Sequence, residues 1–312
     1  MTSDYLARIA SFTESDLPDL DEVVLASLQF LSNATLPQID VATSRRPLVV
    51  GSVNALRTAR MMFSHVDAVF AEEGNYEDAL ARVPAIDAVY VVSASGGKHA
   101  IQIAQTLAAR EIPVFLITNN AEAPARAYVQ PDHVFVFPHL REPYTYNTST
   151  YMSMLQSVSH EPLSDVINHI ETVVMPAIPT NLATYTSFIL TVEPQFEVLR
   201  GMFETKFDEL FGSLRYGRAF TSEEMKHAKT IVPSSSELYI DFGVVPPSHH
   251  YQAPHLTIPV PDWCGPVGML AIGYYVIGYI QKQNQPFFKE NIAAYTKNAS
   301  GIFGQTINSI VE

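Results

Sequence analysis

The chain has little cysteine and little positive charge, and both shortages narrow its possible functions. A single cysteine, Cys264, excludes a disulfide framework and a zinc site built from cysteines. Lys and Arg number 19 against 32 Asp and Glu, which gives a net charge of −13. Because nucleic acids and anionic lipid surfaces are bound through Lys and Arg, we expect neither as a partner. An anionic ligand must be held locally, by backbone N–H groups, hydroxyls and a few placed bases.

Long apolar runs are also scarce. The first twenty residues contain no basic segment followed by an apolar run, so we expect no secretory signal and predict a cytoplasmic protein. One uncharged run, Trp263–Ile280, has 18 residues, which is the lower limit for a membrane span. It contains Pro266, four glycines and three tyrosines. We interpret it as a helix buried in a core or a subunit interface.

Apolar runs alternate with helical patterns through the first half of the chain. The strand-like runs are Pro47–Val50, Ala68–Phe70, Ala88–Val92, Val114–Thr118 and His133–Phe137. The helical patterns are Asp16–Ser32, Ala55–Phe63, His99–Arg110 and Asn147–Val158. Most of the strand runs are almost wholly apolar, as in a parallel sheet covered on both faces. The alternation predicts a doubly wound α/β domain of flavodoxin-like size.

The second half is less regular. We expect helices at Pro162–Ile178, at Phe188–Phe211 with an interruption at Pro194, at Ser222–Lys229, at Val267–Gln281 and at the C-terminus. Strands are expected at Leu238–Phe242 and Leu256–Val260. The length of 312 residues suggests about two domains, and Pro179–Leu182 marks a boundary. We therefore predict domains at 1–180, including the leading helix, and at 181–312.

Small and polar residues follow the first and third predicted strands. Ser52 and Asn54 come after the first, and Ser93, Ser95, Gly96 and Lys98 come after the third. Each group leads into a helix, whose N-terminus presents free N–H groups and a partial positive charge. Two such turns side by side predict a site for a phosphate group. In the alternative interpretation the serines are only helix caps and turn residues.

Residues 93–119 carry the strongest likeness to a known family. Ser93–Asn119 resembles the SIS (sugar isomerase) signature of a strand, a Ser-x-Ser-Gly-x-Thr turn, a helix and a strand ending in Thr. Glu142 to Thr148 resembles the family's Glu-x5-Thr element, which begins the helix that closes the domain. The chain departs at Lys98, where the family has Thr, at Ala100, where it has an acidic residue, and at Val53, where Gly is frequent.

The second half resembles a diverged second SIS domain of the kind found in double-SIS phosphosugar isomerases. The resemblance rests on three features: Gly217-Arg218 before a Lys/His-bearing helix, Ser234–Glu237 before a strand, and an apolar helix before Lys297. It implies two doubly wound flavodoxin-like parallel-sheet domains and a homodimer. Where many relatives have His after that Glu, this chain has Tyr239, and the nearest following histidines are His249 and His250.

Aldose–ketose isomerisation needs a base for the C1/C2 proton, a group for the enediolate oxygens and a group that opens the ring. Glu237 is the predicted base and His227 or His250 the predicted ring-opening group. Lys297 is a further catalytic candidate, which could reach the phosphate or the enediolate, and Arg218 is a candidate for holding the anion. Glu142 and Thr148 are predicted to contact substrate. No spacing typical of metal ligands or of a nucleotide-binding glycine loop occurs, so we expect neither a metal nor a cofactor.

The predicted function is therefore the binding of a sugar phosphate and its isomerisation or deglycation by enediol proton transfer. One alternative is a non-catalytic sugar-phosphate sensor that has lost the acid and base groups. The other is a flavodoxin-like domain that holds a nucleotide or another cofactor. Turnover separates the enzyme from the sensor, and the absorption spectrum of the purified protein separates both from the cofactor binder.

Overall fold

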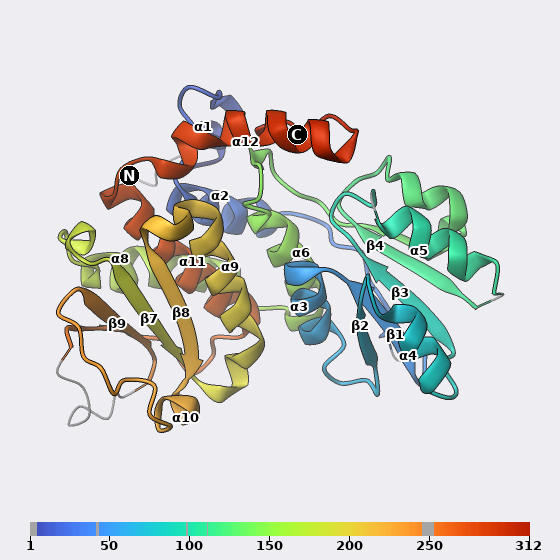
Figure 1. Cartoon of the computed structure of the whole chain (residues 1–312), viewed down its shortest axis with the longest axis horizontal. Helices are drawn as coiled ribbons and strands as arrows, with labels where there is room; N and C mark the ends of the chain where they lie inside the picture. The colour runs from blue at the N-terminus through green and yellow to red at the C-terminus, as the bar shows by residue number, and fades with distance from the viewer. Residues whose placement is uncertain (1–4, 42–43, 98, 111, 245–252) are drawn as a thin grey trace. The chain divides into compact units, whose positions relative to one another are not determined.

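The computed structural model describes residues 5–41, 44–97, 99–110, 112–244 and 253–312. Contacts divide the chain into two compact units. Residues 34–139 and 150–160 form one, which we call the five-strand unit. Residues 1–33, 140–149 and 161–312 form the other, which we call the four-strand unit. Each unit is built on one parallel sheet (Figure 1).

The five-strand unit contains every strand predicted for the first half. These are β1 (Pro47–Gly51), β2 (Val69–Glu72), β3 (Ala88–Val92), β4 (Val114–Thr118) and β5 (Val134–Val136). The helices are α3 (Val53–Met62), α4 (Tyr76–Arg82), α5 (His99–Ala108) and most of α6 (Thr148–Ser159), with 3₁₀ turns η2 (Pro124–Tyr128) and η3 (Pro131–His133). All strands are parallel, in the flavodoxin order β2-β1-β3-β4-β5, which confirms the predicted fold class. The sequence did not predict α4.

Apolar side chains cover both faces of this sheet. Every residue of β1 and β3 is buried. On one face Val91 packs in a cluster with Leu107 of α5. On the other, the ring of Tyr90 meets Phe63 edge-on and stacks on Phe115. Because both faces are covered, a ligand meets this sheet at the ends of its strands.

The four-strand unit holds the second parallel sheet. Its strands are β7 (Ser187–Val192), β8 (Tyr216–Thr221), β9 (Glu237–Phe242) and β10 (His255–Ile258), in the order β10-β9-β7-β8. The helices are α1 (Tyr5–Ser11), α2 (Leu20–Leu31), α7 (Leu163–His169), α8 (Met175–Ala177), α9 (Arg200–Phe211), α10 (Ser222–Met225), α11 (Pro266–Gln283) and α12 (Phe287–Phe303). A π-turn, η4 (Ile170–Val174), joins α7 to α8, and 3₁₀ turns are η5 (Leu182–Thr184), η6 (Pro194–Leu199) and η7 (Gly212–Leu214). Two short strands, β6 (Glu142–Pro143) and β11 (Ile310–Val311), pair antiparallel.

One prediction for this unit was wrong. The stretch 188–211, predicted to be helical, begins with the buried strand β7 and becomes an α-helix only at Arg200. A short apolar run that ends just before Pro194 fits a fully buried parallel strand as well as a buried helix, and periodicity alone does not separate the two. The pairing of β7 between β8 and β9 decides for the strand. The sequence also did not predict β8.

The uncharged run is a buried helix, as predicted. Most residues of α11, from Val267 to Gln281, are buried. None of the helices in the described ranges is long and apolar enough to cross a membrane. At Gly278 a Cβ atom would collide with the backbone of Asp21, so glycine lets α2 and α11 pack closely. Since α11 is buried within its own unit, it gives no support to the homodimer, which remains a prediction.

The grouping of segments differs in part from the division at residue 180. The two sheets do lie on either side of that residue, with β1–β5 before it and β7–β10 after it. The leading helix, which we assigned to the first domain, belongs instead to the compact unit of the second sheet, where α2 packs against α11. The domain boundary at residue 180 therefore stays a prediction. The leading helix groups with the second sheet.

Candidate functional site

The two polar turns singled out in the sequence follow neighbouring strands of the five-strand sheet. Residues 52–54 follow β1 and residues 93–97 follow β3, and these strands pair directly, Gly51 beside Val92. The chain order reverses between β1 and β3, which is where doubly wound sheets bind ligands at their carboxyl ends. We call these two turns the anion cradle. Lys98, which we predicted to belong to it, lies outside the described residues.

The second turn of the anion cradle folds around its own serines. The hydroxyl of Ser93 accepts the N–H of Gly96 at 3.2 Å, and the hydroxyl of Ser95 accepts the N–H of Gly97 at 3.3 Å. A serine that accepts in this way keeps its own O–H as a donor. Both hydroxyls therefore remain able to donate to a ligand oxygen.

The last residue of β4 and residues that follow it hold this turn in place. The hydroxyl of Thr118 donates to the carbonyl of Ala94 at 2.8 Å, and the side-chain amide of Asn120 donates to the carbonyl of Ser95 at 3.0 Å. The N–H of Ala125 donates to the carbonyl of Gly96 at 3.0 Å. Sequence reasoning missed this support. The polar run Thr118-Asn119-Asn120 directly after an apolar strand was the signal that it exists.

Gly96 is the residue of this turn that tolerates substitution least. Its φ is +59°, in the left-handed region, and a Cβ would lie 2.4 Å from the Cβ of Ala123. We expect Gly96→Ala to reduce the affinity for inorganic phosphate at least tenfold while lowering global stability by only about 1–3 kcal/mol. Gly97→Ala is the matched control, because a Cβ there meets only the Ser95 hydroxyl at 3.5 Å. Equal phosphate binding by both variants, measured by calorimetry, would contradict this assignment.

The first turn of the anion cradle presents the start of α3. Ser52 is the N-cap residue, but its hydroxyl makes no capping hydrogen bond. Asn54 is buried, and its amide oxygen accepts a hydrogen bond from Arg57 at 3.1 Å. Val53 between them has a φ of +43° and is 55% exposed. The Ser52 hydroxyl is thus not used in the helix cap, whereas Asn54 is partly engaged by the adjacent arginine.

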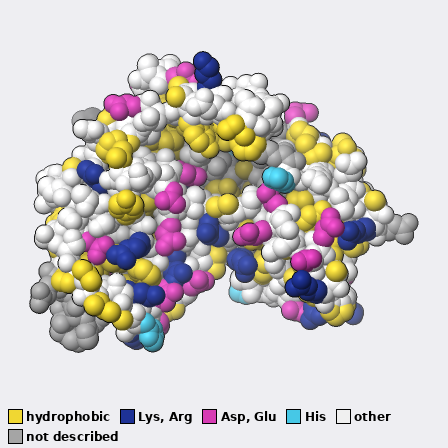
Figure 2. Space-filling model, viewed as in Figure 1, with side chains coloured by type: hydrophobic (Ala, Val, Ile, Leu, Met, Phe, Trp, Pro, Cys, Tyr) yellow, Lys and Arg dark blue, Asp and Glu magenta, His cyan; other side chains and the backbone are white. Residues whose placement is uncertain are grey.

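The cradle is rich in neutral donors. On the face drawn in Figure 2, Lys and Arg side chains are interspersed with Asp and Glu and not gathered into one basic patch. At the start of α5, His99 lies 3.7 Å from the carboxylate of Glu73. That an anion at this site is held mainly by hydroxyls and backbone N–H groups stays a prediction.

Glu142 caps the start of α6, whose first two residues belong to the four-strand unit. It is 3% exposed, and its carboxylate accepts the backbone N–H groups of Thr148 and Ser149, each at 2.7 Å, and the Ser149 hydroxyl. These bonds satisfy two buried N–H groups at the start of α6 that have no partner within the helix. The Thr148 hydroxyl is buried, and no described residue pairs with it. Glu142 therefore has a structural role here, and contact of either residue with substrate stays a prediction.

A buried lysine of α9, Lys206, bonds to the segment between Glu142 and Thr148. The ammonium of Lys206 donates to the carbonyls of Thr145 at 2.9 Å and Tyr146 at 3.0 Å, and to the carboxylate of Glu209 at 2.7 Å. The Lys206 side chain is wholly buried, whereas that of Glu209 is 24% exposed. Burial raises the pKa of Glu209, and the Lys206 charge acts in the opposite direction.

Sequence reasoning missed the pair of Lys206 and Glu209. The available signal was a lysine within the apolar stripe of α9, among Phe203, Phe207 and Leu210. A lysine at such a position is rarely buried unless a partner compensates its charge. Carboxyls with a raised pKa beside a cation are frequent in acid–base catalysis. Among the described residues, no group of His, Cys, Asp and Glu side chains is arranged to hold a metal ion.

No family model and no curated protein matches the sequence, but solved structures match the fold. Glucosamine-6-phosphate deaminase from Thermotoga maritima aligns with a TM-score of 0.62 at 13% identity, over 91% of this chain and 97% of that one. Tagatose-6-phosphate ketose/aldose isomerase from Escherichia coli gives 0.56 at 13%, over 91% and 95%. The C-terminal domain of glucosamine-fructose-6-phosphate aminotransferase from Francisella tularensis gives 0.59 at 11%, over 86% and 97%. This chain has the SIS fold. At these identities the likeness is one of fold.

Within the SIS fold, Glu237 lies at an unexpected end of its sheet. It is the first residue of β9, at the amino ends of the parallel strands, whereas ligands bind at the carboxyl ends. Its carboxylate accepts a hydrogen bond from Arg218 of β8 at 2.6 Å. The two predicted site residues therefore pair with each other. This arrangement argues against Glu237 as a free catalytic base and against Arg218 as a free anion holder.

The remaining predicted residues are scattered. His227 is exposed and follows α10, which ends at Met225, four residues earlier than predicted. Lys297 is exposed on α12. His249 and His250 lie outside the described residues. The catalytic roles of these residues stay predictions.

Proposed function

We propose that this SIS-fold chain binds a sugar phosphate, with the phosphate group in the anion cradle. The observation that carries the proposal is the pairing of two donor-rich turns at the β1/β3 switch point. Ser93 and Ser95 keep O–H donors, Ser52 does not cap its helix, and α3 begins at the same edge. An acidic chain that repels anions at long range needs such a locally built donor set.

We further propose that the bound sugar phosphate undergoes proton transfer between C1 and C2, as in aldose–ketose isomerisation. Glu237, the base predicted from the sequence, is paired with Arg218, so we propose Glu209 of the four-strand unit for this step on the properties of its own carboxyl. Its raised pKa and its partial exposure suit a group that takes a proton from carbon and returns it to the neighbouring carbon. Lys206 holds the carboxylate of Glu209 in place and is a positioning residue. Deglycation, which also proceeds through an enediol, is compatible with the same groups.

A sugar-phosphate sensor is the second candidate function. The ion pair between Glu237 and Arg218 favours it, because the base predicted from the sequence is engaged in the structure. Sensor and enzyme share the anion cradle and differ only in turnover. The homodimer and the cytoplasmic location belong to this proposal as well. Light scattering of the purified chain measures the former.

The test is a thermal-shift screen against hexose, pentose and aminosugar 6-phosphates, followed by NMR in deuterated water. A ligand at about 100 times its dissociation constant stabilises the fold by roughly 2.7 kcal/mol, which is readily seen. We expect a sugar phosphate to raise Tm, Ser95→Ala to weaken that shift, and deuterium to enter at C1 or C2. A shift without deuterium exchange identifies the sensor. No shift with any sugar phosphate refutes the proposed function.

A further inference from the structure

A cavity of about 390 Å³ lies within the four-strand unit, formed by α1, α2, α8 and α11. It is separate from the residues assigned to sugar-phosphate chemistry. The side chains that line it include Asp21, Glu22, Leu25, Tyr275, Tyr279 and Lys282. A cavity of this size, with aromatic and apolar walls and a few charged groups, is typical of a site for a small organic ligand.

Asp21 is the most deeply buried charged group that lines this cavity. It is 4% exposed, at the start of α2, where Gly278 of α11 packs against its backbone. One carboxylate oxygen accepts a hydrogen bond from Lys282 at 3.1 Å. No described residue pairs with the other oxygen. A buried carboxylate oxygen without a hydrogen-bond partner is costly, so a second donor at this place is favourable.

The aromatic side chains beside Asp21 suit a positive charge. The rings of Tyr275 and Tyr279 have centroids 5.2 Å apart. The Lys282 ammonium lies 5.4 Å from the centre of the Tyr279 ring while it bonds to Asp21. The chain's own ammonium group thus already uses a carboxylate and a ring face together, which is how proteins recognise organic cations.

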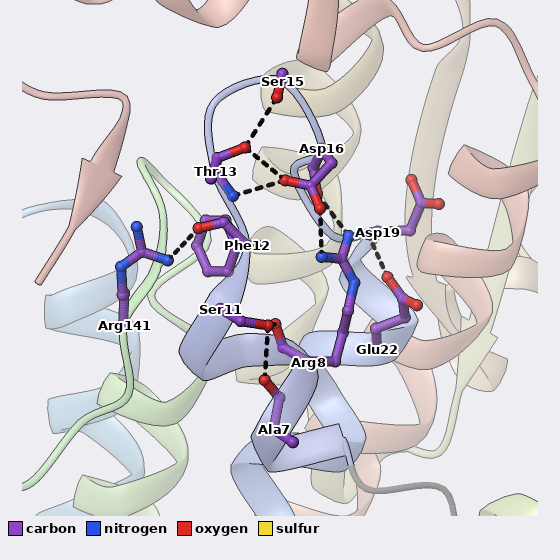
Figure 3. Close-up of polar contacts among 10 residues, drawn as sticks. All are labelled: Ala7, Arg8, Ser11, Phe12, Thr13, Ser15, Asp16, Asp19, Glu22 and Arg141. Atoms are coloured by element: carbon purple, nitrogen blue, oxygen red, sulfur yellow. Dashed lines mark hydrogen bonds and ion pairs between the residues drawn. The ribbon is translucent and has the colours of Figure 1, made fainter.

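The other charged residues of the cavity leave it negative. Figure 3 shows that Arg8 is turned to Asp16, with a 2.8 Å bond to its carboxylate, so the Arg8 charge is compensated. One oxygen of Glu22 accepts the backbone N–H of Asp19 at 3.2 Å (Figure 3). Asp21 and Glu22 therefore outweigh Lys282. An anionic ligand is disfavoured and a cation is favoured.

We propose that this cavity binds a small primary amine in its ammonium form, with an apolar or aromatic body. The ammonium group donates to the carboxylate of Asp21 and lies against the tyrosine rings, and the body of the ligand contacts Leu25 and Met175. The amine site is independent of the proposed function, because none of its residues is used in sugar-phosphate chemistry.

The test is calorimetric titration of the whole chain with phenethylamine at pH 8, alongside its neutral analogue 2-phenylethanol. We expect phenethylamine to bind at least tenfold more tightly than the alcohol. Asp21→Asn is expected to abolish this preference, and Asp132→Asn, which removes an exposed carboxylate elsewhere, to preserve it. Tyr279→Leu, at the half-buried wall, is a second variant and is expected to weaken phenethylamine binding severalfold.

Acidity gives an independent readout. Burial raises the pKa of Asp21 to about 6, opposed by Lys282 and assisted by Asp19 and Glu22, with Tyr275, Tyr279, Tyr5 and Arg8 lining the same cavity. Since the amine needs the ionised carboxylate, its affinity is expected to fall about tenfold between pH 8 and pH 5. Absence of phenethylamine binding, equal binding of the alcohol, or unchanged binding by Asp21→Asn overturns the proposal. Ser95→Ala is expected to leave amine binding intact, which separates this site from the anion cradle.

Discussion

Replacing Glu209 by glutamine is expected to lower kcat/KM for sugar-phosphate isomerisation by about 10²–10⁴-fold, because a positioned general base contributes that much to proton transfer. Glutamine keeps the size and the hydrogen-bond acceptor that Lys206 uses, but it does not accept a proton from carbon. Binding of the sugar phosphate should change little, since the anion cradle is untouched. The measurements are initial rates together with deuterium uptake at C1 and C2.

The matched comparison is Glu237→Gln, which alters the carboxyl that the sequence predicted as the base. We expect this variant to lose at most a few-fold in rate, because Glu237 is already paired with Arg218 at the amino ends of the strands. A large loss in Glu237→Gln with normal turnover by Glu209→Gln would show that the original assignment was right.

The dependence of rate on pH gives a further check on Glu209. Burial raises the pKa of its carboxyl, and only the ionised form acts as a base. The rate should therefore fall as the pH falls through a value above the ordinary range for glutamate. In Glu209→Gln the residual rate should lose this acid limb. An acid limb that persists unchanged in the variant would belong to another group.

The parts of this molecule that could be predicted from the sequence are those encoded by neighbouring residues. Buried parallel strands such as Val114–Thr118 form continuous apolar runs, and the turn at Ser93–Gly97 carries its own serines and glycines. Strand order then brings the two predicted turns together at the switch point, because β1 and β3 are adjacent. The anion cradle is therefore encoded locally, except for the support from Thr118 and Asn120.

The second unit could be predicted less well, because its decisive contacts join distant segments. The sequence of β7 fits a helix as well as a strand, and only its pairing with β8 and β9 identifies it as a strand. The partners of Lys206 include the carbonyl of Thr145, 61 positions earlier in the chain. The choice of Glu237 followed from the resemblance and from a nearby turn. Nothing in the local sequence revealed that Arg218 reaches across β7 to engage it.

The buried lysine is also the basis of the second large prediction. Lys206→Met should destabilise the fold by about 3–5 kcal/mol, because it leaves the Glu209 charge and two carbonyls without their partner. Methionine preserves the length and most of the volume of the side chain, so the loss reports on charge and hydrogen bonds. Urea unfolding, followed by circular dichroism, measures the change in the free energy of unfolding.

The matched control is Lys226→Met. The ammonium of Lys226 bonds to Glu223 at 2.8 Å, and these two residues are three positions apart, as Lys206 and Glu209 are. The side chains of Lys226 and Glu223 are both at least 60% exposed. Exposed pairs contribute within about 1 kcal/mol, so this variant should unfold almost as the parent does. Equal losses in the two variants would show that burial of Lys206 adds nothing.

The sign of the pH dependence follows from Glu209. Burial raises the pKa of this carboxyl, and Lys206 is the group that lowers it. Without Lys206, the folded-state pKa of Glu209 therefore rises further above the unfolded value. A protonated Glu209 is neutral and costs little to bury, whereas an ionised one is unpaired. The deficit of Lys206→Met is therefore expected to be smaller at pH 5 and to grow as the pH rises through the folded-state pKa. A deficit of equal size at pH 5 and pH 8 would mean that the lost hydrogen bonds to Thr145 and Tyr146, and not the charge of Glu209, account for the instability.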